Sequence, residues 1–181
     1  MNFNIENLDK ETLLHLYKAM VLPRTIEEKM LIALRQGKIS KWFSSWGQEA
    51  TSVGSALAMN KEEYILTMHR NLGVFTSREI PLDRLFSQFQ GKMNGFTKGR
   101  DRSFHFGTQE FKIVGMISHL GSQMGVANGI ALSHLLNQEE KCTLVYTGDG
   151  GASEGDFHEA VNTAAVWNLP VIIVVENNQW G

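Results

Sequence analysis

Apolar residues in the first 60 positions recur with the spacing of α-helices. Between residues 9 and 36 they return every three or four positions, which predicts one or two helices with an apolar stripe. Pro23 falls inside this stretch, and we expect a break or restart there because proline has no N–H and clashes with the preceding turn. A further helix is predicted over 48–59. Its expected inward face consists mainly of small residues: Ala50, Val53, Gly54, Leu57 and Ala58.

The middle of the chain combines short elements with a long loop. Residues 64–67 are typical of a short strand, and residues 82–89 carry the apolar face of a helix. Residues 92–116 contain four glycines and no clear period, which indicates a loop long enough to have a function. Residues 121–136 then predict a helix rich in small side chains.

The last 40 residues form a strand–helix–strand pattern. Residues 142–147 and 171–175 are apolar runs typical of buried strands. Between them an apolar stripe has helical spacing: Phe157, Ala160, Val161, Ala164 and Ala165. Such a crossover makes the two strands parallel and brings their carboxyl ends to one edge of the sheet, where open α/β sheets bind ligands. The sequence therefore predicts an α/β fold with a ligand site at this edge.

Oxygen ligands and glycines follow both predicted strands. Asp149 stands between Gly148 and Gly150, and Asn178 follows the second strand. A carboxylate and a carboxamide, completed by backbone and phosphate oxygens, suit magnesium, while Gly150 and Gly151 let the backbone approach an anion closely. The pattern thus favours a divalent cation bound together with a phosphate.

The following helix is expected to begin near Ser153, a suitable N-cap with Asp156 three residues on. Its free N–H groups and positive dipole end would then face the same anion. The alternative is a tight strand-to-helix turn with no ligand.

The residues from Gly148-Asp149-Gly150 to Asn177-Asn178 resemble the thiamine diphosphate motif, with 26 residues between Gly150 and Asn177. Together with Gly47-Gln48-Glu49-Ala50 and Gly121-Ser122-Gln123, the segment is similar to the alpha subunits of 2-oxoacid dehydrogenases, the decarboxylating first components of multienzyme complexes. The resemblance covers nearly the whole chain. It implies a thiamine diphosphate-binding fold, a parallel sheet flanked by helices on both faces.

The resemblance also implies site residues. Cofactor contacts are expected from His69, Arg70, Ser118, Leu120, Gly148, Asp149, Gly150, Gly151, Ala152 and Asn178. Asp149, Asn178 and a backbone oxygen of Trp180 would hold Mg²⁺. His69 departs from the tyrosine usual in the family, whereas Arg70 keeps a fork that matches phosphate. A surface ion pair for Arg70 and a capping role for His69 stay open.

Further candidates line the expected substrate route. Phe43 and Trp46 lie where the family places aromatics at its substrate entrance, although a core or interface role is the alternative. His105 and His119 are the candidate catalytic residues, with plain loop and helix-start roles as alternatives. Branched-chain members hold a structural potassium ion nearby. Ser122 and Gln123 match that site, but Ile117 stands where a hydroxyl is needed, so potassium stays an open alternative.

Composition limits the partners and the cellular compartment that we expect. Seventeen basic against nineteen acidic residues give a net charge of −2, which implies no general attraction to nucleic acid or anionic membranes. The single cysteine, Cys142, is expected in the core of a strand, and no disulfide can form within the chain. The first residues have neither a basic start nor a long apolar run, and no stretch approaches 18 apolar residues. We therefore expect a cytoplasmic protein with no membrane span.

The expected organisation is a helical extension over residues 1–45 and an incomplete diphosphate-binding domain over 46–181. Family members continue past the double asparagine, so we expect an amino-terminal part of a longer polypeptide, inactive alone, with an exposed apolar sheet edge. The glutamate that activates the cofactor would come from a beta subunit or a fused second half, in an α2β2 tetramer or a dimer of fused chains.

The implied activity is that of an oxidoreductase acting on an oxo group, with a lipoyl disulfide as acceptor. It would decarboxylate a 2-oxoacid oxidatively and pass the acyl group to a lipoyl acyltransferase in a multienzyme complex. Ser118, Leu120 and the run 153–156 resemble the branched-chain enzymes more than the pyruvate enzymes, which implies substrates such as 2-oxoisovalerate and hence branched-chain amino acid catabolism. Pyruvate and an acetoin-type diketone are the alternatives. Rivals of another class are a nucleotide-binding module, which lacks its usual glycine fingerprints, and a structural subunit without cofactor.

Overall fold

The computed structural model describes residues 7–116 and 118–181, in two compact units. The first unit comprises residues 7–58 and 70–79, and the second comprises residues 59–69 and 80–181 without Ile117. Ile117, the position where the potassium site would need a hydroxyl, lies outside the described residues.

The first unit is built on one long helix. Helix α1 (Lys10–Arg35) begins at Asp9, whose Oδ1 accepts the backbone N–H of Thr12 at 2.7 Å. The helix runs through Pro23 without interruption, so the predicted break is wrong. Pro23 is buried in the stripe that packs α1 on two shorter helices, and this packing outweighs the N–H that proline lacks.

The two shorter helices approach each other closely. They are α2 (Glu49–Ala58) and α3 (Leu72–Ser77). A Cβ placed on Gly73 would lie only 2.9 Å from side-chain atoms of Ser52 and Val53. The buried face of α2 is Glu49, Ser52, Val53 and Ala56, whereas the predicted Ala50, Gly54 and Ala58 are exposed. Of the predicted inward face only Val53 is fully buried, so the buried face of α2 is turned relative to the predicted one.

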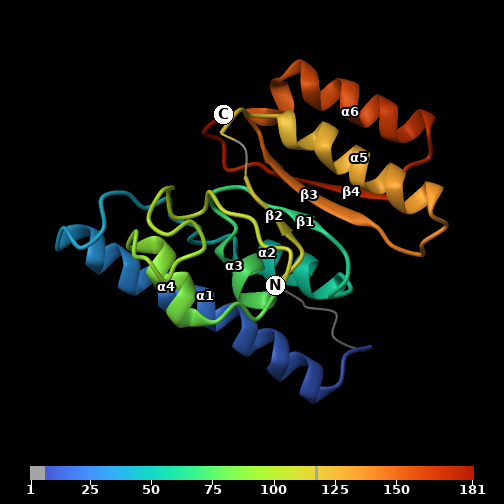
Figure 1. Cartoon of the computed structure of the whole chain (residues 1–181). Helices are drawn as coiled ribbons and strands as arrows, with labels where there is room; N and C mark the ends of the chain where they lie inside the picture. Colours follow the sequence, from blue (N-terminus) through green and yellow to red (C-terminus); the bar gives the residue numbers. More distant parts are fainter. Residues whose placement is uncertain (1–6, 117) are drawn as a thin grey trace. The chain divides into compact units, whose positions relative to one another are not determined.

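The second unit contains a four-stranded parallel sheet in the order β2-β1-β3-β4 (Figure 1). Its strands are β1 (Ile65–Leu66), β2 (Ile113–Val114), β3 (Thr143–Gly148) and β4 (Val171–Glu176). Strands β3 and β4 pair in register from Thr143 opposite Val171 to Gly148 opposite Glu176. The expected parallel pair is confirmed, and with it the α/β class.

Helices α5 (Ser122–Leu136) and α6 (Gly155–Val166) lie side by side over β3 and β4 (Figure 1). Between them and the sheet lies an apolar core of Leu66, Met124, Ala127, Val145 and Ala160. Phe157 also packs on this core, but Val161 and Ala165 of the predicted stripe are exposed. At the outer strand, Ile172 and Val175 are 46 % and 43 % exposed, which agrees with the expected apolar edge.

Helix α4 (Leu82–Phe89) organises the long loop that follows it. Gln88 is buried, and its Oε1 accepts the N–H and Oγ–H of Thr97 while its Nε2 donates to the carbonyl of Arg102. Phe89 packs on Phe104 with ring centroids 5.1 Å apart. The glycine-rich loop is thus tied to the helix by one buried amide.

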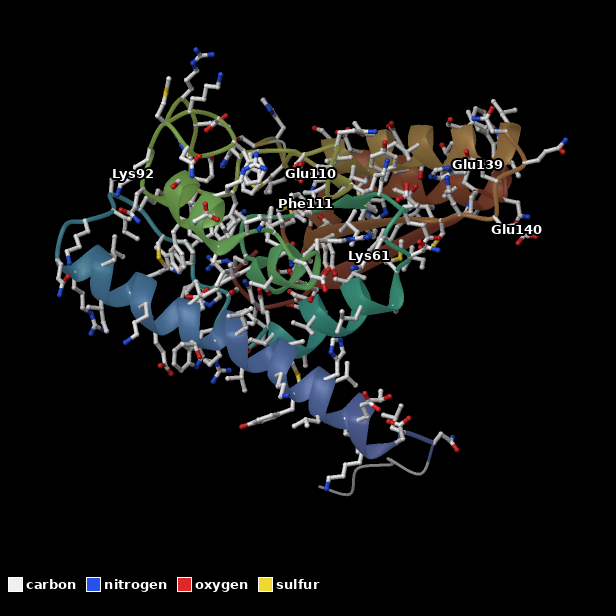
Figure 2. All side chains as sticks on the ribbon, turned by 60° about the horizontal axis from the view of Figure 1, so that its bottom comes forward. Lys61, Lys92, Glu110, Phe111, Glu139 and Glu140 are labelled. Carbon is white, nitrogen blue, oxygen red and sulfur yellow. The ribbon has the colours of Figure 1, made fainter. Side chains whose placement is uncertain are left out.

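Charged side chains of both signs lie at surface loops, as Figure 2 shows for Lys61, Glu139 and Glu140. This mixture accords with the small net charge. In the described parts of the chain, no helix combines the length and apolar character that a membrane crossing needs.

Cys142 immediately precedes β3 and is half-buried, so it is not inside the strand as predicted. Burial raises the pKa of its thiol to about 11. The thiolate is therefore scarce at neutral pH, which argues against a nucleophilic role.

Candidate functional site

The ends of β3 and β4 bring the predicted ligands to one edge of the sheet. Gly148, the last residue of β3, pairs with Glu176, the last residue of β4. Asp149 and Asn178 therefore leave adjacent strand ends, and both are half-buried. The convergence predicted from the sequence is confirmed at the level of topology.

The turn after β3 has no room for larger side chains. The N–H of Gly181 donates to Oδ2 of Asp149 at 2.7 Å, so the segment after β4 lies against the turn. A Cβ on Gly150 would stand 3.3 Å from Cα of Gly181, and one on Gly151 would collide with Oγ1 of Thr147. The close approach of Thr147 and Gly181 therefore requires glycine at both positions.

The two asparagines after β4 shape the returning segment. Oδ1 of Asn177 accepts the N–H of Gln179 at 2.9 Å, and Oδ1 of Asn178 accepts that of Trp180 at 3.1 Å. Each amide oxygen has a second lone pair for another partner. Trp180 is 89 % exposed, so only its backbone belongs to this turn. The assignment of Asp149, Asn178 and Trp180 to a metal stays a prediction.

The helix after the turn begins later than predicted. Residues Gly151–Ser153, with Ala152 between them, form a 3-10 turn, and α6 starts at Gly155 with Glu154 as its N-cap. Ser153 is therefore not the N-cap, and its Oγ instead donates to the carbonyl of Asp149 at 3.4 Å. A serine hydroxyl can bond the backbone carbonyl four residues earlier instead of capping a helix, and the sequence pattern does not distinguish the two.

The segment before α5 lies against the same turn. Cδ1 of Leu120 is 3.9 Å from a Cβ placed on Gly150, and Leu120 is 44 % exposed. Gly121 has φ +87°, and a Cβ on it would be 3.1 Å from Cβ of Asp156. Leu120 thus presents an apolar side chain beside the glycine turn, and its role as a cofactor support stays a prediction.

A histidine–serine pair joins this edge to the long loop. Nε2 of His105 is 2.9 Å from Oγ of Ser118, although 13 positions separate the residues. Both residues were candidates, but no sequence signal indicated that they pair. His119 is exposed and no hydrogen bond of its side chain was found among the described residues, so of the two catalytic candidates His105 is the one tied to the edge.

Gln123 carries an unused oxygen under the sheet edge. Its Nε2 donates to the carbonyl of Tyr146 at 3.0 Å and contacts Sδ of Met68, while its Oε1 is buried with no partner among the described residues. Ser122 lies one position earlier and lines a groove between α5 and α6. An unsatisfied buried oxygen is what a cation would complete, so Gln123 fits the potassium alternative.

The remaining candidates belong to different units. His69 is half-buried in the second unit, three residues after β1. Arg70, Phe43 and Trp46 belong to the first unit. There Nη1 of Arg70 donates to the carbonyl of Ser44 at 2.8 Å, and its guanidinium lies 5.8 Å from the ring centroid of Phe43.

A partly buried ion pair holds the segment that contains these aromatics. Arg24 donates to both oxygens of Glu49, at 2.6 and 2.9 Å, and its guanidinium lies 4.4 Å from the Trp46 ring centroid. Burial raises the pKa of Glu49, but the hydrogen bonds from Arg24 outweigh it and leave the pKa below its ordinary value of 4.5.

The pair gives a testable pH dependence. Because its pKa is lowered in the folded state, Glu49 stabilises the protein above about pH 4.5 and loses this effect as the pH falls through the lower, folded-state pKa. We expect Glu49→Gln to lower the free energy of unfolding by about 1–2 kcal/mol at pH 7, since Arg24 is partly exposed, and by much less near pH 3. Chemical denaturation at pH 7, 5, 4 and 3 would measure this, with the exposed Glu28→Gln as control. An equal loss at every pH would contradict the ionic origin.

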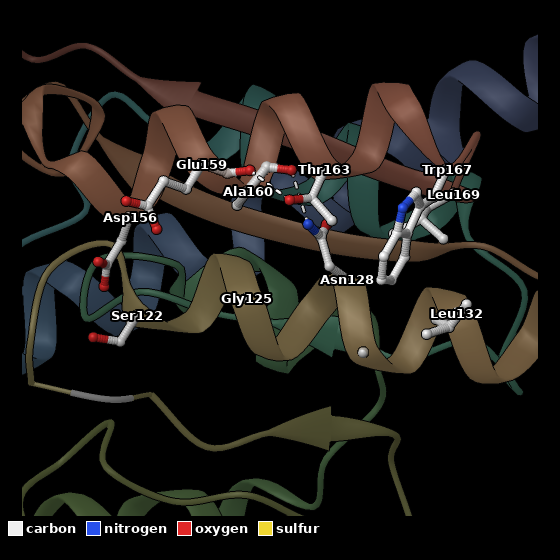
Figure 3. Close-up of a pocket in the computed structure, with 11 residues that line it drawn as sticks. Ser122, Gly125, Asn128, Leu132, Asp156, Glu159, Ala160, Thr163, Trp167 and Leu169 are labelled. Carbon is white, nitrogen blue, oxygen red and sulfur yellow. Dashed lines mark hydrogen bonds between the residues drawn. The ribbon is translucent and has the colours of Figure 1, made fainter.

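A groove also runs between α5 and α6, with Asp156 and Ser122 at one end and Trp167 and Leu169 at the other (Figure 3). Its volume is about 360 Å³. Asn128 lies between the helices and donates to the carbonyl of Ala160 at 2.8 Å. This groove does not include the glycine turn.

The chain matches the family profile of the dehydrogenase E1 component over residues 17–181. It belongs to this family. Among curated relatives, it is 34 % identical over 174 residues to the 2-oxoisovalerate dehydrogenase subunit alpha, mitochondrial, of Dictyostelium discoideum, covering 96 % of this chain and 40 % of that protein. The human protein of the same name is 35 % identical over 172 residues, with 95 % and 39 % covered. Subunit alpha 1 of Arabidopsis thaliana is 33 % identical over 165 residues, with 91 % and 35 % covered.

The resemblance inferred from the motifs is thus confirmed for this E1 family. The chain spans two fifths or less of the length of these relatives. The fold, a parallel sheet with flanking helices, agrees with the cofactor-binding domain of an E1 enzyme.

The oxygen donors at the edge are of the kind that magnesium prefers. The described residues contain no group of three or more histidine, cysteine, aspartate or glutamate side chains that could hold a metal. If Asp149 and Asn178 are the ligands, phosphate and backbone oxygens would supply most of the oxygen shell, which is how magnesium is usually bound.

Proposed function

We propose that the chain is the cofactor-binding part of a thiamine diphosphate- and magnesium-dependent enzyme that oxidatively decarboxylates a 2-oxoacid. The observation that supports this best is the pairing of Gly148 with Glu176, which sets Asp149 and Asn178 at adjacent strand ends beside a turn rich in glycine. Membership of the dehydrogenase E1 component family supports the reaction class.

In this proposal Asp149, Asn178 and the backbone carbonyl of Trp180 hold the magnesium ion. Gly150 and Gly151 allow the diphosphate to approach the backbone, and Arg70 of the first unit stays a predicted contact of its oxygens. The cofactor, when bound, provides the electron sink that makes loss of carbon dioxide feasible. The protein contributes orientation, charge and the exclusion of water.

His105 and Ser118 are proposed to place a polar group beside the reacting end of the cofactor. The imidazole and hydroxyl share one hydrogen bond, so the serine orients the ring and the ring can accept or donate a proton at Nε2. Leu120 supports the cofactor from the apolar side. His119, exposed as it is, is proposed only as a contact of incoming substrate.

The partners follow from the names of the relatives, which are alpha subunits. We propose assembly with a beta subunit or a fused beta-like half that supplies the group activating the cofactor. The acyl product would pass to the lipoyl group of an acyltransferase component. The relatives named above are called mitochondrial, whereas the cytoplasmic location expected from the sequence stays a prediction.

A branched-chain 2-oxoacid is the proposed substrate, with pyruvate as the second candidate. The relatives named above are all 2-oxoisovalerate dehydrogenase subunits, and Leu120 and the aromatics Phe43 and Trp46 offer apolar surface. Each buried methylene contributes about 0.8 kcal/mol, so two extra carbons predict a preference for 2-oxoisovalerate over pyruvate of roughly 10-fold.

The test measures kcat/KM of the assembled enzyme for both acids with an artificial electron acceptor. A tenfold preference for pyruvate would end the branched-chain assignment and leave the thiamine chemistry standing. Titration with thiamine diphosphate plus Mg²⁺, and with ATP plus Mg²⁺ in parallel, separates the enzyme from a nucleotide-binding module. Binding heat in the titration with ATP plus Mg²⁺, and none with thiamine diphosphate plus Mg²⁺, would contradict the proposed function.

Potassium is proposed as a third ligand, held by Oε1 of Gln123 with Ser122 nearby. Thermal unfolding in 100 mM KCl against 100 mM NaCl tests it. We expect a higher Tm in potassium for the wild type and no difference for Gln123→Leu, because the leucine supplies no oxygen. Equal Tm values for the wild type in both salts would contradict the site.

A further inference from the structure

The first unit contains a fully buried carboxylate whose hydrogen bonds all go to one loop. Glu27 of α1 is 0 % exposed. Its Oε2 accepts from Nε1 of Trp42 at 2.8 Å, and its Oε1 accepts from both N and Oγ of Ser45 at 2.6 Å. These donors are 15 and 18 positions away in sequence. We refer to residues 41–47 as the aromatic loop.

The aromatic loop is fixed so that some side chains point inward and others outward. Trp42 and Ser45 are 8 % and 3 % exposed, whereas Trp46 is 51 % exposed and Phe43 is half-buried. Two further anchors act from the flanks, since Glu49 accepts the N–H of Gly47 at 3.0 Å and Arg70 binds the carbonyl of Ser44. The inward residues and the flanks therefore determine where Phe43 and Trp46 stand.

Helix packing alone does not explain Glu27. A buried carboxylate costs free energy unless it is fully hydrogen-bonded, and an apolar residue would fill the same space on a helix more cheaply. None of the hydrogen bonds of Glu27 found among the described residues goes to α2 or α3, on which α1 packs. The carboxylate acts on the loop.

We infer that Glu27 is a positioning residue that sets the aromatic loop, and through it the conformation of Phe43 and Trp46, the aromatics predicted at the substrate entrance. This rests on the proposed function, in which the two aromatics form the substrate entrance. Glu27 does not touch the cofactor or the reacting atoms. It determines which side chains the entrance accepts.

Glu27→Gln in the assembled enzyme tests the inference. The amide places an NH₂ group against the donors of Trp42 or Ser45, so one anchor is lost while the size is kept. We expect hydrogen exchange of the Ser45 amide to accelerate at least about 10-fold. KM for 2-oxoisovalerate should rise about 10-fold with kcat changed less than about twofold, because uniform binding is lost rather than transition-state binding. The preference for 2-oxoisovalerate over pyruvate should shrink by a similar factor, and the Kd for thiamine diphosphate should stay unchanged.

Glu28→Gln is the matched control, because Glu28 is the next residue on α1 and is exposed. It should change none of these readouts. Ser45→Ala keeps the backbone N–H and loses only the hydroxyl bond, so its effects should be in the same direction and smaller. If Glu27→Gln fails to fold, Trp42→Phe, which removes one donor and keeps an aromatic ring, is judged by the same criteria.

Two results would overturn the inference. One is a fall in kcat with KM and the substrate ratio unchanged. The other is faster Ser45 exchange with no change in either kinetic parameter, which would restrict Glu27 to stability. Failure of the proposed function looks different. In that case the wild-type enzyme shows no thiamine-dependent decarboxylation, and the role of Glu27 at a substrate entrance is excluded as well. Hydrogen exchange of the Ser45 amide still reports whether Glu27 holds the aromatic loop.

Discussion

Replacing Asp149 with alanine is expected to abolish magnesium-dependent binding of thiamine diphosphate by the assembled enzyme. Asp149 directly follows β3 at the edge where Gly148 pairs with Glu176, so its loss removes the carboxylate proposed to bind magnesium there. Partners that only orient a metal ligand change affinity 10–100-fold, and loss of the ligand itself should exceed that, so we expect Kd to rise more than about 100-fold. Calorimetric titration with the cofactor at saturating Mg²⁺ measures it.

Controls separate the metal effect from a general change at the turn. Asp149→Asn keeps the size and one oxygen, and should give an intermediate affinity that higher Mg²⁺ partly restores. Glu159→Gln removes an exposed carboxylate from α6 and should leave Kd unchanged. Unchanged affinity in Asp149→Ala, or equal binding by the wild type in chelator, would exclude the metal assignment.

The part of the fold that could be predicted is the part where one periodicity continues long enough. Strands β3 and β4 are uninterrupted apolar runs with a helix between them, and parallel pairing follows from the crossover. Strand β1 falls within the short strand predicted over 64–67, whereas β2 has only two residues and is defined by its pairing with β1 rather than by its own pattern. Helix α3 has six residues, too few for a periodic signal.

Other misses come from tertiary context that outweighs a local rule. Pro23 predicts a break, but burial of its face keeps α1 continuous. Ser153 has the composition of an N-cap, yet the 3-10 turn moves the start of α6 two residues on. The position of Glu27 does indicate buried hydrogen bonds. It stands between Ile26 and Met30 on the apolar stripe of α1, where a charged residue needs a buried partner.

The sequence predicts those parts of the site that follow from the order and direction of the strands, and not the contacts made by the loops. Sequence spacing places Asp149, Asn178 and the glycines at one edge, because the strands carry them there. It gives no access to the pair His105–Ser118 or to the contact of Leu120 with the glycine turn, since both depend on how loops return to the edge. Loop paths are set by a few side-chain anchors such as Gln88, which leave no periodic trace in the sequence.

The return of one such loop depends on Gly121, and Gly121→Ala is expected to lower both stability and cofactor affinity. At φ +87° an L-residue is strained by about 1–3 kcal/mol, and the new Cβ would stand 3.1 Å from Cβ of Asp156. Relief of this contact would shift Ser118 and Leu120 together, because they directly precede the glycine, so we expect the Kd for thiamine diphosphate to rise about 10-fold.

Gly125→Ala in α5 should have the opposite effect and raise the free energy of unfolding. Nothing lies within 4 Å of a Cβ placed there, and its φ is ordinary, so alanine should stabilise α5 by about 0.5–1 kcal/mol through the smaller entropy of the unfolded chain. Denaturant unfolding of the two variants beside the wild type measures both signs, and titration measures the cofactor. If both alanines stabilise the protein, Gly121 does not need its left-handed conformation, and the approach of Leu120 to the glycine turn must be set by residues other than Gly121.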